Sequence, residues 1–281
     1  MYDELEARTV DGVTLRIDRV RAAQRRGAVV CLHAMMTDGR YFGARRDGSF
    51  AAALARSGLD VLVADFRGHG RSVPPHAGKD DWSFDDLVEH DLPAIVDAVC
   101  EATELPAREV AILGHSLGGL VACAALATRR IQPPRVLGLV ATSVWLGETP
   151  ARRAVMRTYR GVTALLGRAP IRALRVGTAD ESASYVDQLA MWSSTKRWTS
   201  LRGVDYLAAL DTIAVPAFAV CGATDWMCRP ADADAIAKRI KHCEPLRVVG
   251  TRHGDAIDPD HFQLFTQPAL SRRWTEIAEK L

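Results

Sequence analysis

Short runs of apolar residues, each of strand length and none alternating with polar residues, recur along the 281-residue chain. Glycine, proline or charged residues bound each run, and patterns of helical spacing separate most of them. Unalternating runs rich in Val, Leu and Ile are typical of strands whose two faces are both covered. The sequence therefore predicts an α/β fold with a mostly parallel sheet between layers of helices. The expected strands are residues 28–32, 61–64, 110–113, 136–140, 215–220 and 246–249.

The clearest helical pattern runs from Ser83 to Glu104, and it opens with the capping-box pair Ser83 and Asp86. Pro93 is a candidate kink in this helix. Near the start of the chain, Asp11-Gly12 separates two strand-like runs, which predicts a hairpin of antiparallel edge strands. Further helices are expected over residues 49–57, 117–129, 231–241 and 264–281.

The stretch from about Leu146 to Leu210 interrupts this alternation, because it contains helical patterns but no convincing central strand. We expect residues 146–210 to be a helical cap inserted after the sixth strand. Residues 1–145 and 211–281 would then form the core domain. Ligands in open α/β sheets bind at the carboxyl edge of the strands, so such an insertion would roof the binding site.

Composition and charge exclude several classes of protein. The chain has 36 basic and 34 acidic residues, a net charge of +2, and 48% hydrophobic residues, which argues against disorder and against a nucleic-acid-binding surface. No run reaches the roughly 18 apolar residues of a transmembrane segment, and the acidic start lacks a signal-peptide pattern. The six cysteines form no C-x-x-C pair and are expected to be reduced and buried, with a cytoplasmic location as the default.

The strongest chemical signal is Gly114-His115-Ser116-Leu117-Gly118-Gly119, a G-x-S-x-G motif. A predicted strand ends just before it and a predicted helix begins within it, which is the context of a nucleophile elbow. The glycines allow a sharp turn that exposes the serine hydroxyl, and the helix amino terminus would stabilise negative charge there. Ser116 is therefore the candidate nucleophile, although a glycine-rich turn with a serine cap would give the same pattern.

With this motif the chain resembles the α/β-hydrolase fold enzymes, and within them a poorly characterised group of bacterial hydrolases. The resemblance extends from about Ala28 to Leu281. It rests also on Asp65-Phe66-Arg67-Gly68-His69-Gly70-Arg71-Ser72, on Gly222-Ala223-Thr224-Asp225 and on Asp260-His261-Phe262-Gln263-Leu264-Phe265. It implies an α/β-hydrolase fold, a Ser-acid-His triad in that chain order and a helical cap. The Asp65–Ser72 turn is expected to be structural rather than catalytic.

The resemblance implies that His261 is the general base, because Asp260-His261-Phe262 matches the position of the base in the related group. Asp260 replaces the usual glycine, however, and His253 follows the last expected strand more closely, so His253 remains the alternative base. Asp225 lies a short turn beyond a predicted strand, where the family has its acid, and Glu148 is the fallback.

The oxyanion is expected to be bound by two backbone amides. One is the N–H of Leu117, the residue after the serine. The other comes from the loop after the first central strand, His33-Ala34-Met35-Met36, where we select Met35 with Ala34 as the near alternative. His33 itself is expected to secure this loop.

The sequence thus predicts a serine hydrolase that cleaves a carboxylic ester or related acyl bond, with a small-molecule acyl substrate and no metal or organic cofactor. An acyltransferase or thioesterase would use the same residues, and a non-catalytic binding protein of this fold is a third reading.

Overall fold

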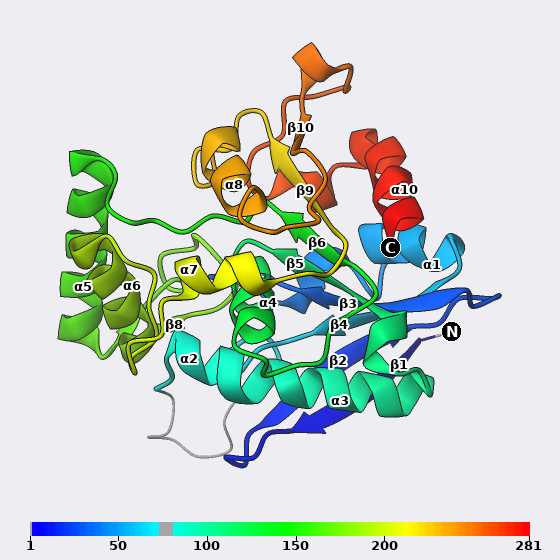
Figure 1. Cartoon of the computed structure of the whole chain (residues 1–281), viewed down its shortest axis with the longest axis horizontal. Helices are drawn as coiled ribbons and strands as arrows, with labels where there is room; N and C mark the ends of the chain where they lie inside the picture. Colours follow the sequence, from blue (N-terminus) through cyan, green and yellow to red (C-terminus); the bar gives the residue numbers. More distant parts are fainter. Residues whose placement is uncertain (1, 73–80) are drawn as a thin grey trace.

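The computed structural model describes residues 2–72 and 81–281. Eight strands form the central sheet in the order β1-β2-β4-β3-β5-β6-β9-β10 (Figure 1). β2 pairs antiparallel with both β1 and β4, and the other neighbours are all parallel, so the predicted mostly parallel sheet is confirmed. These strands are β1 (Tyr2–Arg8), β2 (Thr14–Val20), β3 (Gly27–Leu32), β4 (Leu59–Ala64), β5 (Val110–His115), β6 (Leu137–Val140), β9 (Ala217–Gly222) and β10 (Arg247–Val249).

Helices cover both faces of this sheet (Figure 1). α3 and α4 pack on one face, whereas α1 and α10 pack on the other, and each face has its own cluster of buried apolar side chains. Every residue of β3, β4, β5 and β9 is buried, which explains why the runs do not alternate. The helices are α1 (Phe50–Arg56), α2 (Phe84–Asp86), α3 (Leu92–Thr103), α4 (Leu117–Ala127), α5 (Pro150–Leu166), α6 (Ala183–Thr195), α7 (Tyr206–Ala209), α8 (Pro230–Ala237), α9 (Gln263–Thr266) and α10 (Ser271–Lys280).

Two predicted helices differ in detail from the observed ones, and a proline accompanies each difference. The capping box of Ser83 and Asp86 is present, but a π-helical turn over Leu87–Asp91 separates α2 from α3 just before Pro93. The expected single helix over residues 264–281 is wrong, because the chain forms α9, a 3-10 turn that begins at Pro268, and α10. Proline has no N–H to continue the helical hydrogen bonds, so a break at this position follows.

The segment between β6 and β9, residues 146–210, contains α5, α6, α7 and a separate ladder of β7 (Arg168–Ala169) with β8 (Glu181–Ser182). Figure 1 shows α5 and α6 side by side, away from the main sheet. The side chain of Gln188 on α6 accepts a hydrogen bond of 2.9 Å from the Phe84 N–H, which ties this segment to α2. We call residues 146–210 the insertion.

Among residues 2–72 and 81–281, no helix combines the length and the apolar character needed to cross a membrane. All six cysteines carry free thiols, and four of them are buried: Cys31, Cys123, Cys221 and Cys228.

Candidate active site

Ser116 lies at the turn between β5 and α4, with a φ of +52° and a ψ of −110°. Residues other than glycine rarely adopt a positive φ, and they keep it only where surrounding contacts enforce it. The glycines of the motif supply these contacts: a Cβ on Gly114 would lie 2.4 Å from the Gly119 backbone, and one on Gly118 would lie 2.4 Å from the Leu32 carbonyl oxygen. The motif is therefore a tight strand–turn–helix in which the backbones of β3, β5 and α4 touch.

Asp225 and His261 form a buried pair. Asp225 follows β9, and its Oδ1 accepts a hydrogen bond of 2.7 Å from the Cys228 N–H. Its Oδ2 lies 2.7 Å from Nδ1 of His261, and both residues are 2% exposed. A neutral imidazole that donates from Nδ1 to a carboxylate has Nε2 free as an acceptor. Within the described residues, Nε2 of His261 is buried and has no hydrogen-bond partner.

Ser116 and His261 line the same pocket. No hydrogen bond joins the Ser116 hydroxyl to the His261 ring among the residues that the structure describes, and catalytic hydrogen bonds are often long before substrate binds. His115, next to the serine, supports the His261 loop, since its Nε2 lies 3.0 Å from the His261 carbonyl oxygen. Burial holds the pKa of His115 well below its usual value, so this ring is neutral and donates to the carbonyl.

The alternative residues lie elsewhere. His253 is exposed in a short 3-10 turn after β10 and does not line the pocket of Ser116. Glu148 is bound to Arg152 at 3.1 Å and likewise does not line that pocket. The structure therefore brings Ser116, Asp225 and His261 together and leaves His253 and Glu148 apart from them.

The loop after β3 also reaches the pocket. Met35 and Leu117 both line it, and in the described chain neither backbone N–H donates to a protein acceptor. His33 secures the loop, because its Nε2 accepts from the Phe66 N–H at 3.1 Å and its Nδ1 lies 2.8 Å from the Ala34 carbonyl oxygen. Burial lowers the pKa of His33 to about 3, so the ring is neutral in this role.

The pocket has a cavity volume of about 410 Å³. None of the described residues that line it is an Asp, Glu, Lys or Arg, so it suits an uncharged, apolar ligand. Trp192 is buried and lines the cavity, and Trp198, which does not line it, packs against Trp192. The other lining residues are Met35, Met36, Ser116, Leu117, Leu120, Ser143, Val144, Trp145, Val155, Met156, Tyr159, Val176, Tyr185, Leu189, Trp226, Met227, His261 and Phe262.

The sequence missed most of this lining. Trp226 directly follows the predicted acid Asp225, and this position is the sequence feature that could have identified it as a lining residue. Its side chain is 65% exposed. Val155, Met156 and Tyr159 come from α5, and no local pattern distinguishes a pocket-lining helix face from one that packs on the core.

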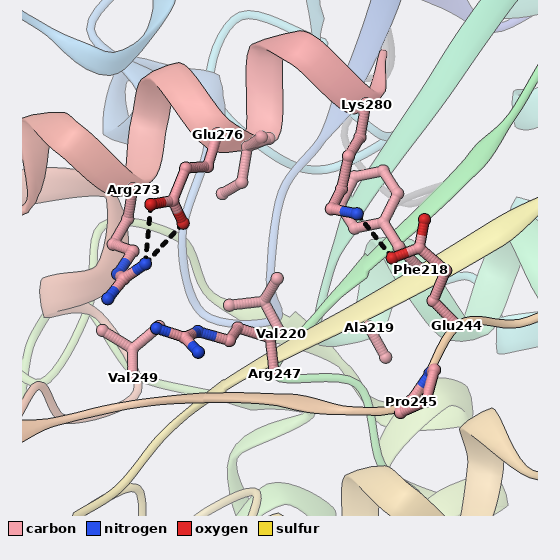
Figure 2. A pocket seen from close by; sticks show the side chains of 11 residues that line it. Phe218, Ala219, Val220, Glu244, Pro245, Arg247, Val249, Arg273, Glu276 and Lys280 are labelled. Carbon is pink, nitrogen blue, oxygen red and sulfur yellow. Dashed lines mark hydrogen bonds and ion pairs between the residues drawn. The ribbon is translucent and has the colours of Figure 1, made fainter. Parts of the chain in front are cut away.

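A second cavity lies between β9, β10 and α10 (Figure 2). Its volume is about 40 Å³. Two ion pairs border it, one between Arg273 and Glu276 and one between Lys280 and Glu244. This space is close to that of a single water molecule, so it is too small for a substrate.

Cys221, Asp225 and Cys228 form the one cluster in the described chain whose side chains are spaced for a metal ion. Both oxygens of Asp225 already accept hydrogen bonds, and the Cys221 thiol donates to the Cys228 carbonyl oxygen at 2.9 Å. The hydrogen bond with Cys228 and burial raise the pKa of Cys221, which keeps the thiol protonated. Binding of a metal ion here would have to deprotonate Cys221 and replace the hydrogen bonds of Asp225, including the one to His261.

A sequence profile of the family described as "Serine aminopeptidase, S33" matches residues 23–260. The chain belongs to this family. The tear acid lipase-like protein of Mesocricetus auratus is 29% identical over 143 residues, which cover 46% of the chain and 35% of that protein. Lysophospholipase L2 of Escherichia coli K12 is 36% identical over 124 residues, which cover 42% of the chain and 34% of that protein. The matched segment thus spans about a third of the length of these relatives.

Solved structures resemble this S33 family member over its whole length. The esterase EaEST of Exiguobacterium antarcticum superposes with a TM-score of 0.68 at 17% identity and covers 98% of both chains. The α/β hydrolase GrgF of Penicillium sp. sh18 superposes with a TM-score of 0.69 at 19% identity and covers 100% of this chain and 98% of the other. The α/β-hydrolase fold expected from the sequence is confirmed.

Proposed function

We propose that the protein is a serine hydrolase that cleaves carboxylic esters with an uncharged, apolar acyl chain. The observation that carries the proposal is the buried pair of Asp225 and His261, because His261 lines the same apolar pocket as Ser116 and its Nε2 has no hydrogen-bond partner among the described residues. The curated relatives include lipases and a lysophospholipase, which supports ester chemistry, and the absence of charged lining residues supports an apolar acyl chain.

In this mechanism Ser116 attacks the ester carbonyl carbon while Nε2 of His261 takes the hydroxyl proton. Asp225 holds His261 in the tautomer with the proton on Nδ1 and stabilises the imidazolium that forms. The backbone N–H groups of Leu117 and Met35 bind the tetrahedral oxyanion. The carbon–oxygen ester bond then breaks, and the leaving alcohol takes the proton from His261. Water repeats the cycle on the acyl-enzyme and releases the acid. The insertion, residues 146–210, caps the pocket and selects the acyl chain.

The test is covalent labelling of the folded protein with a fluorophosphonate probe, together with hydrolysis of p-nitrophenyl butyrate. We expect a probe adduct on Ser116, and we expect Ser116→Ala to abolish the adduct and to reduce kcat by about 10⁶-fold. The melting temperature should stay close to that of the parent. An adduct that persists in Ser116→Ala, or no adduct at all on the folded parent protein, would refute the proposal.

Acyl transfer is the second candidate, because it differs only in the molecule that attacks the acyl-enzyme. It is distinguished by adding an acceptor alcohol to the assay and measuring the ratio of new ester to free acid. The apolar lining of the pocket favours neither outcome. Hydrolysis is the primary proposal because the curated relatives include lipases and a lysophospholipase.

A further inference from the structure

One residue of the insertion holds the loop that carries Met35. Glu181, at the start of β8, is 1% exposed, and its Oε1 accepts a hydrogen bond from the Met36 N–H. The Met36 carbonyl oxygen in turn accepts from the N–H of Thr178 at 2.8 Å and of Ala179 at 3.3 Å. The insertion therefore binds Met36 through both of its backbone polar groups, although the two segments are far apart in the sequence.

Met36 is held in an unfavourable backbone conformation, with a φ of +61°. A residue with a side chain keeps such a conformation only where its surroundings enforce it. Gly177 packs closely against Met36 and helps to enforce this conformation. A Cβ on Gly177 would lie only 2.2 Å from the Met36 carbonyl oxygen. Glu181 and the backbone from Gly177 to Ala179 thus form a clamp on Met36, which we call the Met36 clamp.

The Met36 clamp occupies one amide of the loop, and the hydrogen bonds of the Ala34 carbonyl orient the amide before it. The Ala34 carbonyl oxygen accepts a hydrogen bond of 2.9 Å from the Thr37 hydroxyl and lies 2.8 Å from Nδ1 of His33. The N–H of Met35 belongs to the same planar trans peptide and therefore points the opposite way. The N–H of Met36 is occupied by Glu181. The Met35 amide is left as the loop's candidate oxyanion donor.

Glu181 has a buried partner in His69, whose Nε2 lies 3.4 Å from the same carboxylate oxygen. Burial opposes protonation of this ring, but the nearby Glu181 carboxylate and the Arg67 carbonyl raise the pKa of His69 overall. His69 belongs to the Asp65–Ser72 turn, for which the sequence predicted only a structural role. The Glu181 carboxylate therefore contacts both the Met36 N–H and the His69 ring, so one buried side chain links the insertion to the loop after β3 and to the Asp65–Ser72 turn.

We propose that Glu181 is a positioning residue for the hydrolysis. It acts through the Met36 N–H to hold the loop after β3, and thereby places the Met35 amide where the oxyanion forms. This inference rests on the proposed function, because it assigns Glu181 a role only if Ser116 generates an oxyanion in this pocket. Glu181 itself touches neither the serine nor the bound ester, since it does not line the pocket.

The test compares Glu181→Ala with Glu181→Gln, because glutamine keeps an acceptor oxygen for the Met36 N–H. Misplacing a catalytic group by about 1 Å can cost about 100-fold in rate, so we expect Glu181→Ala to lower kcat for p-nitrophenyl butyrate by about 10- to 100-fold. The KM should change by less than about 3-fold, because Glu181 itself does not line the pocket. Glu181→Gln should recover most of the lost kcat.

A second variant disturbs the Met36 clamp without removing a charged side chain. Gly177→Ala adds one methyl group against the Met36 carbonyl oxygen, and we expect the same loss of kcat. Gly161→Ala is the matched control, because Gly161 lies in α5 of the same insertion and a Cβ there would have nothing within 4 Å. If Glu181→Ala fails to fold, the kcat of Gly177→Ala tests whether the Met36 clamp positions the Met35 amide.

The readout that separates positioning from general damage is inhibition by an alkyl trifluoromethyl ketone, which forms a tetrahedral oxyanion on a serine. Its inhibition constant should rise in Glu181→Ala and Gly177→Ala by about the same factor as kcat/KM falls. Folded variants with kcat and inhibition within twofold of the parent would overturn the role of Glu181. If the parent and Ser116→Ala hydrolyse the ester equally, the proposed function itself fails, which is a different result.

Discussion

The turns at the carboxyl ends of β5 and β9 and the insertion between β6 and β9 contribute to the same pocket in opposite ways. The two turns contain Ser116 and Asp225. Close backbone packing holds the first turn, and a buried hydrogen bond from the Cys228 N–H to Asp225 holds the second. The insertion contributes Val155 and Val176, which are 53% and 60% exposed, and most of the large exposed apolar side chains of the described chain belong to it. Under the proposed function, we therefore expect the chemistry to depend on the two tightly packed turns and substrate choice to depend on the more exposed insertion.

After the loss expected for Ser116→Ala, the largest effect is expected at the partner of Asp225. We expect His261→Ala to reduce kcat for p-nitrophenyl butyrate by about 10⁴-fold or more, because it removes the base that takes the serine proton. His253→Ala, at an exposed site outside the pocket, should keep the parent kcat. Steady-state kinetics of both variants check this. A loss of kcat confined to His253→Ala would show that His253, and not His261, is the general base.

The next effect is on stability. In Gly114→Ala the new Cβ would lie 2.4 Å from the Gly119 backbone, so we expect a loss of about 3 kcal/mol of unfolding free energy from overpacking. Gly161→Ala in the insertion adds its methyl group to open space and should be neutral or stabilising by about 0.5–1 kcal/mol. Urea unfolding measures both, and equal effects would remove the contrast between the two regions.

The smallest effect concerns substrate choice. Trp226 lines the pocket and is 65% exposed, so Trp226→Ala should fold normally. It should lower kcat/KM for a p-nitrophenyl ester with a long acyl chain by about 10-fold, which is the typical contribution of a few buried methylene groups. The acetate ester, which is too short to reach the ring, should be hydrolysed at the parent rate. An equal loss of kcat/KM with both esters would show that Trp226 affects the chemical step and not the binding of the acyl chain.

The sequence predicted the fold well because the features that define it are local. Unbroken apolar runs identified the buried strands, and the strand–turn–helix around Ser116 identified the elbow before any tertiary contact was known. The single helix expected over residues 264–281 was wrong, because Pro268 lacks the N–H that a continuous helix needs.

The candidate site was only partly predictable. The pairing of Asp225 with His261 was proposed from chain order and from a family resemblance, and the observed 2.7 Å contact agrees with it. The contact of Glu181 with Met36 joins residues 145 positions apart, and nothing local in either segment indicates it. The division of the chain into a core and a cap at residues 146–210 stays a prediction.

The pairing of β6 with β9 has a consequence for how such proteins diversify. These strands are parallel neighbours, so a connection of a dozen or more residues must join them whatever its sequence. Residues 146–210 lie within this crossover, and their β7–β8 ladder is separate from the eight-stranded sheet. A segment of different length and shape could therefore be exchanged at this point, giving a related enzyme a new specificity while the parent scaffold is inherited intact.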